Sequence, residues 1–478
     1  MNNLEIINLL PGILLGFASV LALISITIRR NHKFTYTVTA TSLIGVFYFL
    51  ITYAVNKKIT LEPLFIIDGF GLFNTGLLII SSLVVVMISY PYFEQREERK
   101  EEYYILLILA TLGACMLVIS KHFISLFLGL EILSIALYGM IAYLRKRERS
   151  DEAGIKYLIL AAFSSAFLLF GMALIYTETG TMDFEGIAMY MFTQEKLPLI
   201  MSTGFGLMIV GIGFKLGIVP FHLWTPDVYE GAPAPVTAFI ATVSKGGMII
   251  LLVRFFVIIK GAHYPVLVTT FTVLSIASMF VGNFLALRQN NVKRILAYSS
   301  IAHMGYILVA FLAGGELGAE AVCFYLVAYF ATSLGAFGII AVLADEDRDA
   351  ERLDDYKGLL WSRPWIASGF IAALLSLAGI PLTAGFIGKF YIVAAGVSTH
   401  RWLLVIMLAI NSVIGLFYYI KIIAVMFERP TAEEKTSLHP KLYWVNLAAL
   451  LMLAIVMIWL GVSPQGLIDL IRELLVST

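Results

Sequence analysis

Long apolar runs alternate with short polar segments from one end of the chain to the other. Each run is roughly 20 residues long, which is enough for an α-helix to cross the ~30 Å hydrocarbon layer of a membrane. The runs follow one another closely and leave no room for a large domain outside the membrane. The pattern therefore predicts an all-α polytopic membrane protein that forms one domain over residues 1–478.

About fourteen such runs are expected to be transmembrane helices. Their approximate bounds are 7–28, 35–55, 70–91, 103–119, 122–144, 154–176, 198–220, 234–259, 264–286, 295–314, 318–343, 364–396, 401–427 and 441–462, and a short amphipathic tail follows at 466–476.

The composition supports this interpretation and excludes several function classes. Hydrophobic residues make up 60% of the chain and charged residues 14%, which is far more apolar than a soluble domain. A net charge of +1 argues against a nucleic-acid partner, and no glycine-rich phosphate-binding motif is present. Both cysteines, Cys115 and Cys323, lie inside apolar runs, so this chain alone builds neither a disulfide framework nor an iron–sulfur cluster.

Lysine and arginine residues favour the loops on one side of the membrane. If the chain begins outside, the inside loops hold 20 of the 33 basic residues. Seven lie on the outer side, at Lys57, Lys58, Lys121, Lys196, Lys260, Arg401 and Arg472. Because cytoplasmic loops are enriched in Lys and Arg, both termini are predicted to be periplasmic.

Four charged side chains fall deep inside predicted helices: Glu131, Lys215, Lys245 and Lys389. A charge at the centre of a membrane helix costs at least ~2.5 kcal/mol, so such residues usually face a bundle interior and serve an ion path. A neutral glutamic acid held by a hydrogen bond, or a lysine reaching toward an interface, is the alternative. The depth of these positions favours the functional interpretation.

Other polar residues within the runs leave both interpretations open. Lys156 lies near the start of its run and can either reach the cytoplasm or take part in transfer. Arg254 and Lys421 are nearer helix ends, where extension to the interface is favoured. His303 stands among small residues and His222 follows Pro220, and histidine suits a proton relay because its unperturbed pKa is near neutrality.

Two of the runs are interrupted by proline, at Pro220 in the seventh and Pro381 in the twelfth. Proline removes a backbone donor and clashes with the preceding turn, so both helices are expected to break near mid-membrane. Lys215 precedes its proline whereas Lys389 follows its own, and the two runs have opposite orientation. This symmetry predicts two inverted five-helix repeats, at 101–260 and 261–430, with three helices before them at 1–100 and a last helix and tail at 431–478.

A family resemblance is carried by residues 213–247, GFKLGIVPFHLWTPDVYEGAPAPVTAFIATVSKGG. This stretch closely resembles the signature of the N-subunit family of bacterial respiratory complex I, the NADH:quinone oxidoreductase. Supporting stretches are LFLGLEILSIALYGMIAY, RQNNVKRILAYSSIAHMGY and LSLAGIPLTAGFIGKFYIV, so the resemblance covers nearly the whole chain. The sister M and L subunits and the multisubunit cation/proton antiporters share the broken-helix plan but differ in WTPDVYEGAPAP, which we interpret as a loop.

The resemblance implies roles for the buried charges. It implies that Glu131 pairs with Lys215, that Lys245 is the central lysine and that Lys389 is the terminal base, where the M subunit typically has glutamate. It also favours Lys156 and His303 as relay residues. The implied partners are other membrane subunits, including the M subunit and small subunits of the K, J and A types, in the bacterial inner membrane. NADH, FMN, iron–sulfur clusters and quinone are expected in other subunits and none in this chain.

The expected function is therefore proton translocation driven by quinone reduction elsewhere in the complex. An autonomous cation/proton antiporter would use the same charges without a redox partner, and a purely structural scaffold would not need them. A heme-bearing quinone oxidase is the least favoured alternative, because the seven histidines offer no convincing ligand pair. The acidic segment 345–358 is interpreted as a solvated cytoplasmic loop, with docking to a neighbouring subunit as the alternative.

Overall fold

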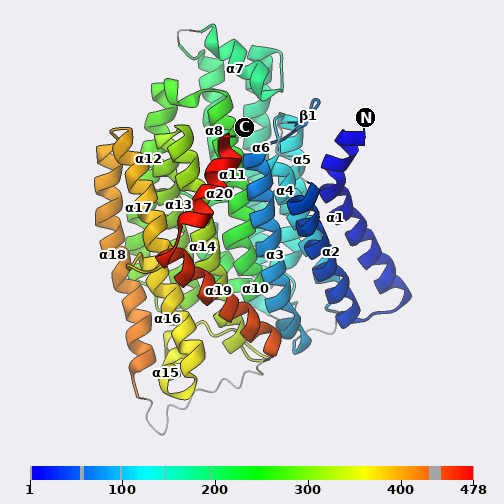
Figure 1. The fold of residues 1–478 in the computed structure, drawn as a ribbon, viewed down its shortest axis with the longest axis vertical. Helices are drawn as coiled ribbons and strands as arrows, with labels where there is room; N and C mark the ends of the chain where they lie inside the picture. The colour runs from blue at the N-terminus through cyan, green and yellow to red at the C-terminus, as the bar shows by residue number, and fades with distance from the viewer. Residues whose placement is uncertain are drawn as a thin grey trace.

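The computed structural model describes residues 3–53, 59–96, 99–145, 147–194, 196–429 and 443–476. These residues form one bundle of helices around a continuous apolar core (Figure 1). The α-helices are α1 (Asn3–Ile28), α2 (His32–Tyr53), α3 (Gly69–Glu94), α4 (Glu102–Val118), α5 (Phe123–Ile141), α6 (Glu148–Thr179), α7 (Phe184–Phe192), α8 (Leu199–Leu216), α9 (Trp224–Gly231), α10 (Ala234–Phe239), α11 (Lys245–Ile258), α12 (Pro265–Leu287), α13 (Val292–Ala313), α14 (Gly315–Leu343), α15 (Leu359–Ser362), α16 (Pro364–Ala378), α17 (Ala384–Ser398), α18 (Trp402–Phe427), α19 (Trp444–Val462) and α20 (Gln465–Val476).

Twelve helical segments among the described residues are long and apolar enough to cross a membrane. Three shorter apolar helices, α4, α16 and α17, add to them. The prediction of an all-α polytopic membrane protein is therefore confirmed. The count of fourteen stays a prediction, which is reached if α4 spans the membrane and α16 and α17 are the halves of one span.

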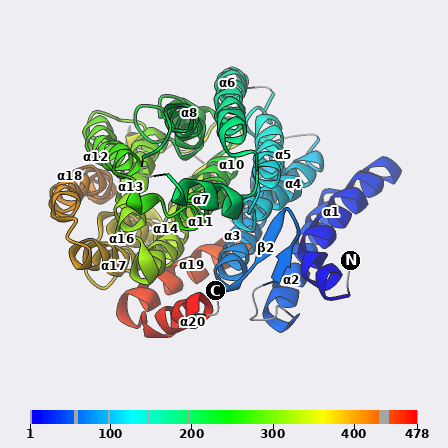
Figure 2. The same ribbon diagram turned by 90° about the horizontal axis from the view of Figure 1, so that it is seen from above.

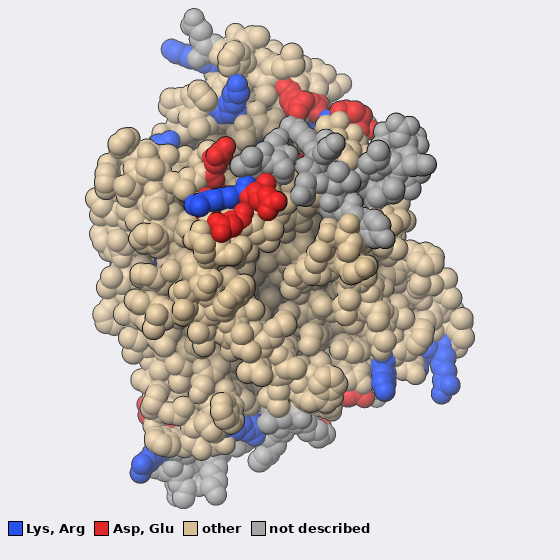
Figure 3. Space-filling model, viewed as in Figure 1, with Lys and Arg blue, Asp and Glu red and all other residues tan. Residues whose placement is uncertain are grey.

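The two ends of the bundle differ in charge. The end that carries α15, lower in Figure 1, holds the loops rich in Lys and Arg, and we call it the basic end. The start of α1 and the end of α20 lie toward the other end, as expected for termini on one side. Between the ends, the face shown in Figure 3 is largely free of charged side chains. Of the basic residues expected on the outer side, Lys57 and Lys58 lie outside the described residues.

The structure contains elements that the hydrophobic pattern did not predict. A two-stranded antiparallel hairpin, β1 (Ile59–Leu61) and β2 (Phe65–Ile67), joins α2 to α3. Helix α7 lies at the end opposite the basic end, where Asp183 caps it by accepting a hydrogen bond from Gly186. Both elements are too short for a spanning-helix pattern to reveal them.

The seventh span breaks at the predicted place, but it continues beyond its expected end at residue 220. Helix α8 ends at Leu216, and Gly217 has the left-handed conformation, with φ 69°. After a turn containing Pro220, the second half of the span is α9, which lies in the segment WTPDVYEGAPAP. The expectation that this segment is a loop was wrong, because the chain resumes a helix at Trp224 after the turn.

The twelfth span breaks as predicted. Helix α16 ends at Ala378, Gly379 adopts a left-handed conformation with φ 84°, and α17 begins at Ala384. Pro381 lies in the turn between the halves.

The eighth span contains an irregularity that the sequence did not suggest. Residues Ile240–Ser244 form a π-helical turn, η1, between α10 and α11. A π-turn inserts a residue into the helical ladder and is frequent at functional sites. The turn ends immediately before Lys245 and so sets the direction of that side chain.

Three spans occupy the centre of the bundle: the α10–α11 span, α13 and α14 (Figure 2). These are almost entirely buried, whereas α1, α2 and α19 are mostly exposed at the periphery. Helix α4 packs along α5, as α12 packs along α13 in the other half of the chain. The most buried helices therefore carry the central lysine and histidine, Lys245 and His303.

Candidate functional site

The three lysines predicted from the sequence all lie at or beside irregular backbone. Lys215 is in the last turn of α8, Lys245 follows the π-turn, and Lys389 lies in the half-helix α17. Their exposed fractions are 3%, 1% and 8%. Each lysine is therefore enclosed by protein rather than extended to an interface.

Lys215 contacts hydroxyl groups rather than a carboxylate. Its Nζ donates to Ser134 Oγ on α5 at 3.0 Å and to Tyr157 Oη on α6 at 2.9 Å. Glu131 is one turn before Ser134, is half-buried, and accepts a hydrogen bond from Ser165 Oγ at 2.6 Å. The implied pairing of Glu131 with Lys215 is thus not a direct contact here, although Ser134 lies on the same helix as the glutamate.

Lys245 lies between the broken α8–α9 span and α13. Its Nζ donates to Ser300 Oγ at 2.7 Å, and the ring centroid of Tyr229 on α9 is 5.4 Å away. A Cβ atom added to Gly217 would lie 3.4 Å from the same Nζ. The absence of a side chain at the first helix break therefore leaves room for the Lys245 ammonium.

His303 lies one turn after Ser300 on α13 and makes two hydrogen bonds to tyrosines. Its Nδ1 is 2.7 Å from Tyr325 Oη on α14, and its Nε2 is 3.1 Å from Tyr419 Oη on α18. Tyr419 is also hydrogen-bonded to Ser299, the neighbour of Ser300. The histidine is 4% exposed, so both ring nitrogens depend on these hydroxyl groups.

Lys389 occupies the second helix break. Its Nζ donates to the Ala378 carbonyl at the end of α16, at 2.8 Å, and to Ser412 Oγ on α18, at 2.9 Å. The carbonyl end of a helix carries partial negative charge and stabilises a cation. The ring of Tyr306 on α13, 5.2 Å from Nζ, lies on the side of His303.

Together these contacts form what we call the polar row. It comprises Glu131, Ser165, Ser134, Tyr157, Lys215, Lys245, Ser299, Ser300, His303, Tyr325, Tyr419, Lys389 and Ser412. Figure 2 shows its helices in order, from α5 on one side through α11 and α13 near the centre to α18 on the other. The row thus crosses the bundle from one broken span to the other.

Three buried polar atoms near the first break have no partner among the described protein atoms. These are His222 Nδ1, Thr225 Oγ1 and Ser244 Oγ. Buried polar atoms are nearly always hydrogen-bonded to protein or to ordered water. Of these atoms, Thr225 Oγ1 is the one placed near the central lysine, because a Cβ added to Gly217 would lie 2.6 Å from it and 3.4 Å from Lys245 Nζ. His222 lies in the turn of the first break.

Lys156 lies at the basic end and contacts the broken span from outside. It is 45% exposed, and its Nζ is 2.6 Å from Glu152 and 3.2 Å from Asp227 on α9. These residues line a cavity of about 250 Å³ together with Arg149 and Glu230. The adjacent Tyr157 contacts Lys215, so α6 joins the cavity to the polar row.

The expectation that Arg254 extends to an interface was wrong. Its guanidinium makes two hydrogen bonds to the Asp68 carboxylate, at 2.6 and 2.8 Å, and a third to the Val118 carbonyl at 2.9 Å. Arg254 and Asp68 are both 5% exposed. The sequence concealed this pair because Asp68 is 186 residues away, in the segment before α3. Lys421, by contrast, donates to Gln289 and Asn290 in the loop after α12, and its extension to an interface stays a prediction.

The acidic segment 345–358 is folded onto its own chain. Asp349 is 3% exposed and accepts hydrogen bonds from Tyr92 and Lys293, and Asp355 is held by Arg348. Burial opposes ionisation, but the charges of Lys293, Arg147 and Arg96 outweigh it and hold the pKa of Asp349 below its usual range. The solvated-loop expectation was therefore wrong for Asp349 and Asp355, whereas Asp354 is exposed.

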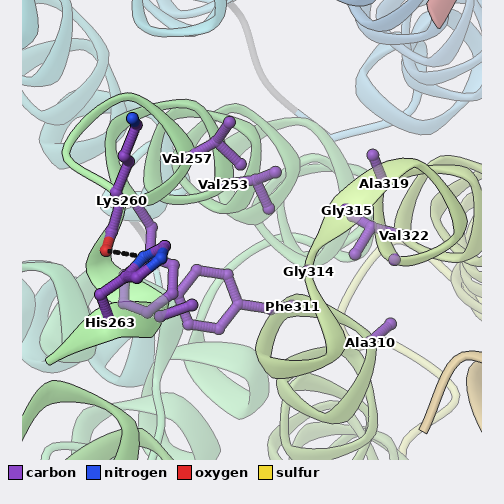
Figure 4. A pocket seen from close by; sticks show the side chains of 13 residues that line it. Val253, Val257, Lys260, His263, Ala310, Phe311, Gly314, Gly315, Ala319 and Val322 are labelled. Carbon is purple, nitrogen blue, oxygen red and sulfur yellow. Dashed lines mark hydrogen bonds between the residues drawn. The ribbon is translucent and has the colours of Figure 1, made fainter. Parts of the chain in front are cut away.

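The described residues offer little for a cofactor or metal. Among them, no group of three His, Cys, Asp or Glu side chains could hold a metal ion. The apolar cavity in Figure 4, about 180 Å³ between the ends of α11 and α13 and the start of α14, contains none of the predicted site residues. Cys115 and Cys323 are both buried and unpaired with each other.

The sequence-based prediction did not include the hydroxyl groups that contact the charged residues of the polar row. Ser299, Ser300 and His303 share one face of α13 by their spacing, and Tyr325 and Tyr329 are likewise one turn apart on α14. Polar residues at this spacing in apolar helices were the signal that could have located these groups.

Comparison with known proteins gives the family. Residues 120–415 match the family described as NADH:quinone oxidoreductase/Mrp antiporter, TM. The chain is 44% identical to NADH-quinone oxidoreductase subunit N of Methylococcus capsulatus, over 96% of this chain and 93% of that protein. It is 48% identical to the subunit N of Nitrosospira multiformis, over 98% and 96%.

Solved structures share the fold. A chain of respiratory complex I from Thermus thermophilus with bound aureothin has a TM-score of 0.83 at 29% identity, over 96% of this chain and 98% of that one. A chain of the Mrp complex from a Dietzia species has a TM-score of 0.86 at 19% identity, over 99% and 97%, and this likeness shows the fold alone. The chain therefore belongs to the NADH:quinone oxidoreductase/Mrp antiporter family and, within it, to the subunit N proteins of NADH-quinone oxidoreductase.

Proposed function

We propose that this chain is the proton-translocating subunit N in the membrane arm of a NADH:quinone oxidoreductase, and that it moves protons while quinone is reduced in other subunits. The relatives' names support the assignment to that enzyme complex. The observation that carries the mechanism is the polar row, in which buried lysines at two helix breaks contact hydroxyl groups and a histidine.

A hydroxyl group both donates and accepts hydrogen bonds, so it can receive a proton on one side and release one on the other. Lys215 has two such neighbours, Lys245 has Ser300, and Lys389 has Ser412. His303, with a tyrosine at each ring nitrogen, would link the central lysine to the second break. Water at Thr225 and Ser244, the buried atoms without protein partners, would complete the path beside the first break.

The driving step is electrostatic. Burial favours a neutral lysine, and a nearby carboxylate favours a charged one. Because Lys215 is hydrogen-bonded to Ser134 on α5 and Tyr157 on α6 and not to Glu131 itself, a small movement of α5 or α6 would strengthen or weaken the attraction between Glu131 and Lys215. Such a change would load or release a proton at Lys215, and the change in charge would pass through Lys245 to Lys389. Lys156 and Asp227 would admit protons at the basic end.

Neighbouring subunits are part of this proposal. Glu131 is only half-buried, and Leu128 and Ile135 on the same helix are 46% and 62% exposed. A carboxylate at mid-membrane depth is costly against lipid. We infer that another membrane subunit covers this face, with the M subunit and small subunits of the K, J and A types as the candidates. NADH, FMN, iron–sulfur clusters and quinone would be bound by other subunits.

The proposed location is the bacterial inner membrane, with the basic end in the cytoplasm and both termini in the periplasm. The enrichment of Lys and Arg at one end supports this orientation. A single cysteine placed at Asn3 should react with a membrane-impermeant maleimide in intact spheroplasts. Labelling only after permeabilisation would reverse the orientation.

Co-purification distinguishes this function from an autonomous cation/proton antiporter. A tagged chain solubilised in mild detergent should retain NADH:quinone oxidoreductase activity and migrate with redox subunits on a native gel. Reconstituted alone, it should not exchange Na⁺ or K⁺ for protons. Cation exchange by the isolated chain, without associated redox subunits, would support the antiporter instead.

A further inference from the structure

The C-terminal end of α9, at the basic end of the bundle, is held by a lysine from another helix. Lys293, near the start of α13, donates from Nζ to the carbonyl of Glu230 at 3.0 Å and to that of Ala232 at 2.6 Å. The last carbonyls of a helix lack partners within it and attract cations. Lys293 therefore caps the C-terminal end of the second half of the broken span, although it is only 1% exposed.

Asp349 holds the capping lysine in place. Its Oδ2 accepts the third hydrogen bond of the Lys293 ammonium, at 2.9 Å, so all three donors of that group have partners. Its Oδ1 accepts from Tyr92 Oη on α3 at 2.7 Å and from Arg147, before α6, at 3.3 Å. Asp349 thus ties α9 and α13 to α3 and α6 across the two halves of the chain.

The capped helix also reaches the polar row. Tyr229 precedes Glu230, its ring centroid lies 5.4 Å from Lys245 Nζ, and its Oη is 3.3 Å from the Oγ of Ser300. One turn earlier, Asp227 accepts from Lys156 and from Arg294. A shift of α9 would therefore change the surroundings of Lys245 and the contact made by Lys156.

We propose that Lys293 and Asp349 form a clamp that fixes α9, and that they are positioning residues for proton transfer at Lys245. This proposal rests on the proposed function, but the two clamp residues contact neither end of the polar row. It assigns a role to the folded acidic segment, whose buried aspartate holds the broken span from outside the membrane.

The test uses the assembled complex with Lys293→Met and, in case that variant fails to assemble, the nearly isosteric Asp349→Asn. Lys421→Met is the matched control, because Lys421 also donates to a loop carbonyl and an amide at the basic end but does not contact α9. Hydrogen exchange of the α9 amides is measured by mass spectrometry. Protons taken up per NADH oxidised are measured in inverted vesicles.

In both clamp variants, α9 should exchange about tenfold faster, because Lys293→Met removes the cation at its C-terminal end and Asp349→Asn removes the carboxylate that holds that cation in place. Protons per NADH should fall at least twofold, whereas the control changes neither. A clamp that only stabilises the fold would lower the amount of complex and leave the ratio unchanged, which would overturn the proposal. Unchanged α9 exchange would overturn it as well.

These outcomes are separable from failure of the proposed function itself. If Lys245→Met pumps like the wild type, the polar row does not carry protons, regardless of how fast the α9 amides exchange. If Lys245→Met fails to pump while both clamp variants pump normally, the row stands and only the clamp is rejected.

Discussion

At the scale of residues, the structure separates buried charges that contact neutral groups from a buried charge that is paired with a carboxylate. Lys215, Lys245 and Lys389 contact neutral hydroxyl or carbonyl groups, as the proposed proton transfer requires. Arg254 instead has a bidentate carboxylate partner, and guanidinium does not release its proton under physiological conditions. A buried charge in a membrane helix is therefore interpreted by its partners, not by its depth alone.

The Arg254–Asp68 pair is expected to be structural. Asp68→Asn keeps a side-chain oxygen that can cap α3 but leaves the buried guanidinium without a counter-charge, which costs about 3–5 kcal/mol. The purified complex should unfold at a lower temperature. The double variant Asp68→Asn/Arg254→Met should recover most of the loss, because no buried charge remains.

Asp354→Asn provides the control for this pair. Asp354 pairs with Lys357 at 3.4 Å, but the side chains of Asp354 and Lys357 are 80% and 25% exposed, so loss of this carboxylate should cost under about 1 kcal/mol. Equal destabilisation by Asp68→Asn and Asp354→Asn would show that burial of the Arg254 pair carries no special weight.

At the scale of elements, the breaks place backbone and lysines together. Gly217 ends α8 in a left-handed conformation, and a Cβ there would lie 2.6 Å from Thr225 Oγ1 and close to Lys245. Gly379 ends α16 in the same way beside Lys389. Helix α8 therefore ends where Lys245, from another span, needs space. Helix α16 ends where Lys389, from the other half of the same span, needs space.

Gly217→Ala should disturb the first break. Alanine in the left-handed conformation costs about 1–2 kcal/mol, and the added methyl group crowds Thr225. Proton uptake per NADH should fall in the assembled complex. Gly206→Ala, in the same helix with open space around it, is the matched control and should pump normally. Normal pumping by Gly217→Ala would show that the shape of the break is not critical.

At the scale of the whole molecule, the polar row links two halves with the same plan. The pairing of α4 with α5 and of α12 with α13, and the broken spans α8–α9 and α16–α17, support the proposal of repeats at 101–260 and 261–430. The central helices carry Lys245 and His303, and Glu131, on α5 at one side of the row, is half-buried and would be covered by the proposed neighbour. A signal from a neighbour at α5 would therefore enter at one side of the bundle and reach α18 at the other.

Much of the fold and of the candidate site could be predicted from the sequence, because charged residues and prolines are conspicuous within apolar membrane helices. Apolar runs locate helices, and Pro220 and Pro381 locate breaks, through local rules that need no partner. The π-turn before Lys245 left no composition signal, and the Asp68–Arg254 and Asp349–Lys293 pairs join residues far apart in the chain. Whether a buried lysine meets a carboxylate or a hydroxyl depends on helix packing, which one-dimensional patterns do not specify.

The most direct test of the central claim is NADH-driven proton uptake by vesicles, normalised to assembled complex, for Glu131→Gln and Lys215→Ala. Both variants should assemble and pump markedly less than the wild type, because one loses the charge that acts on Lys215 and the other loses the proton carrier. Lys215→Arg should also pump poorly, since guanidinium keeps its proton. Wild-type pumping by both Glu131→Gln and Lys215→Ala would contradict the account.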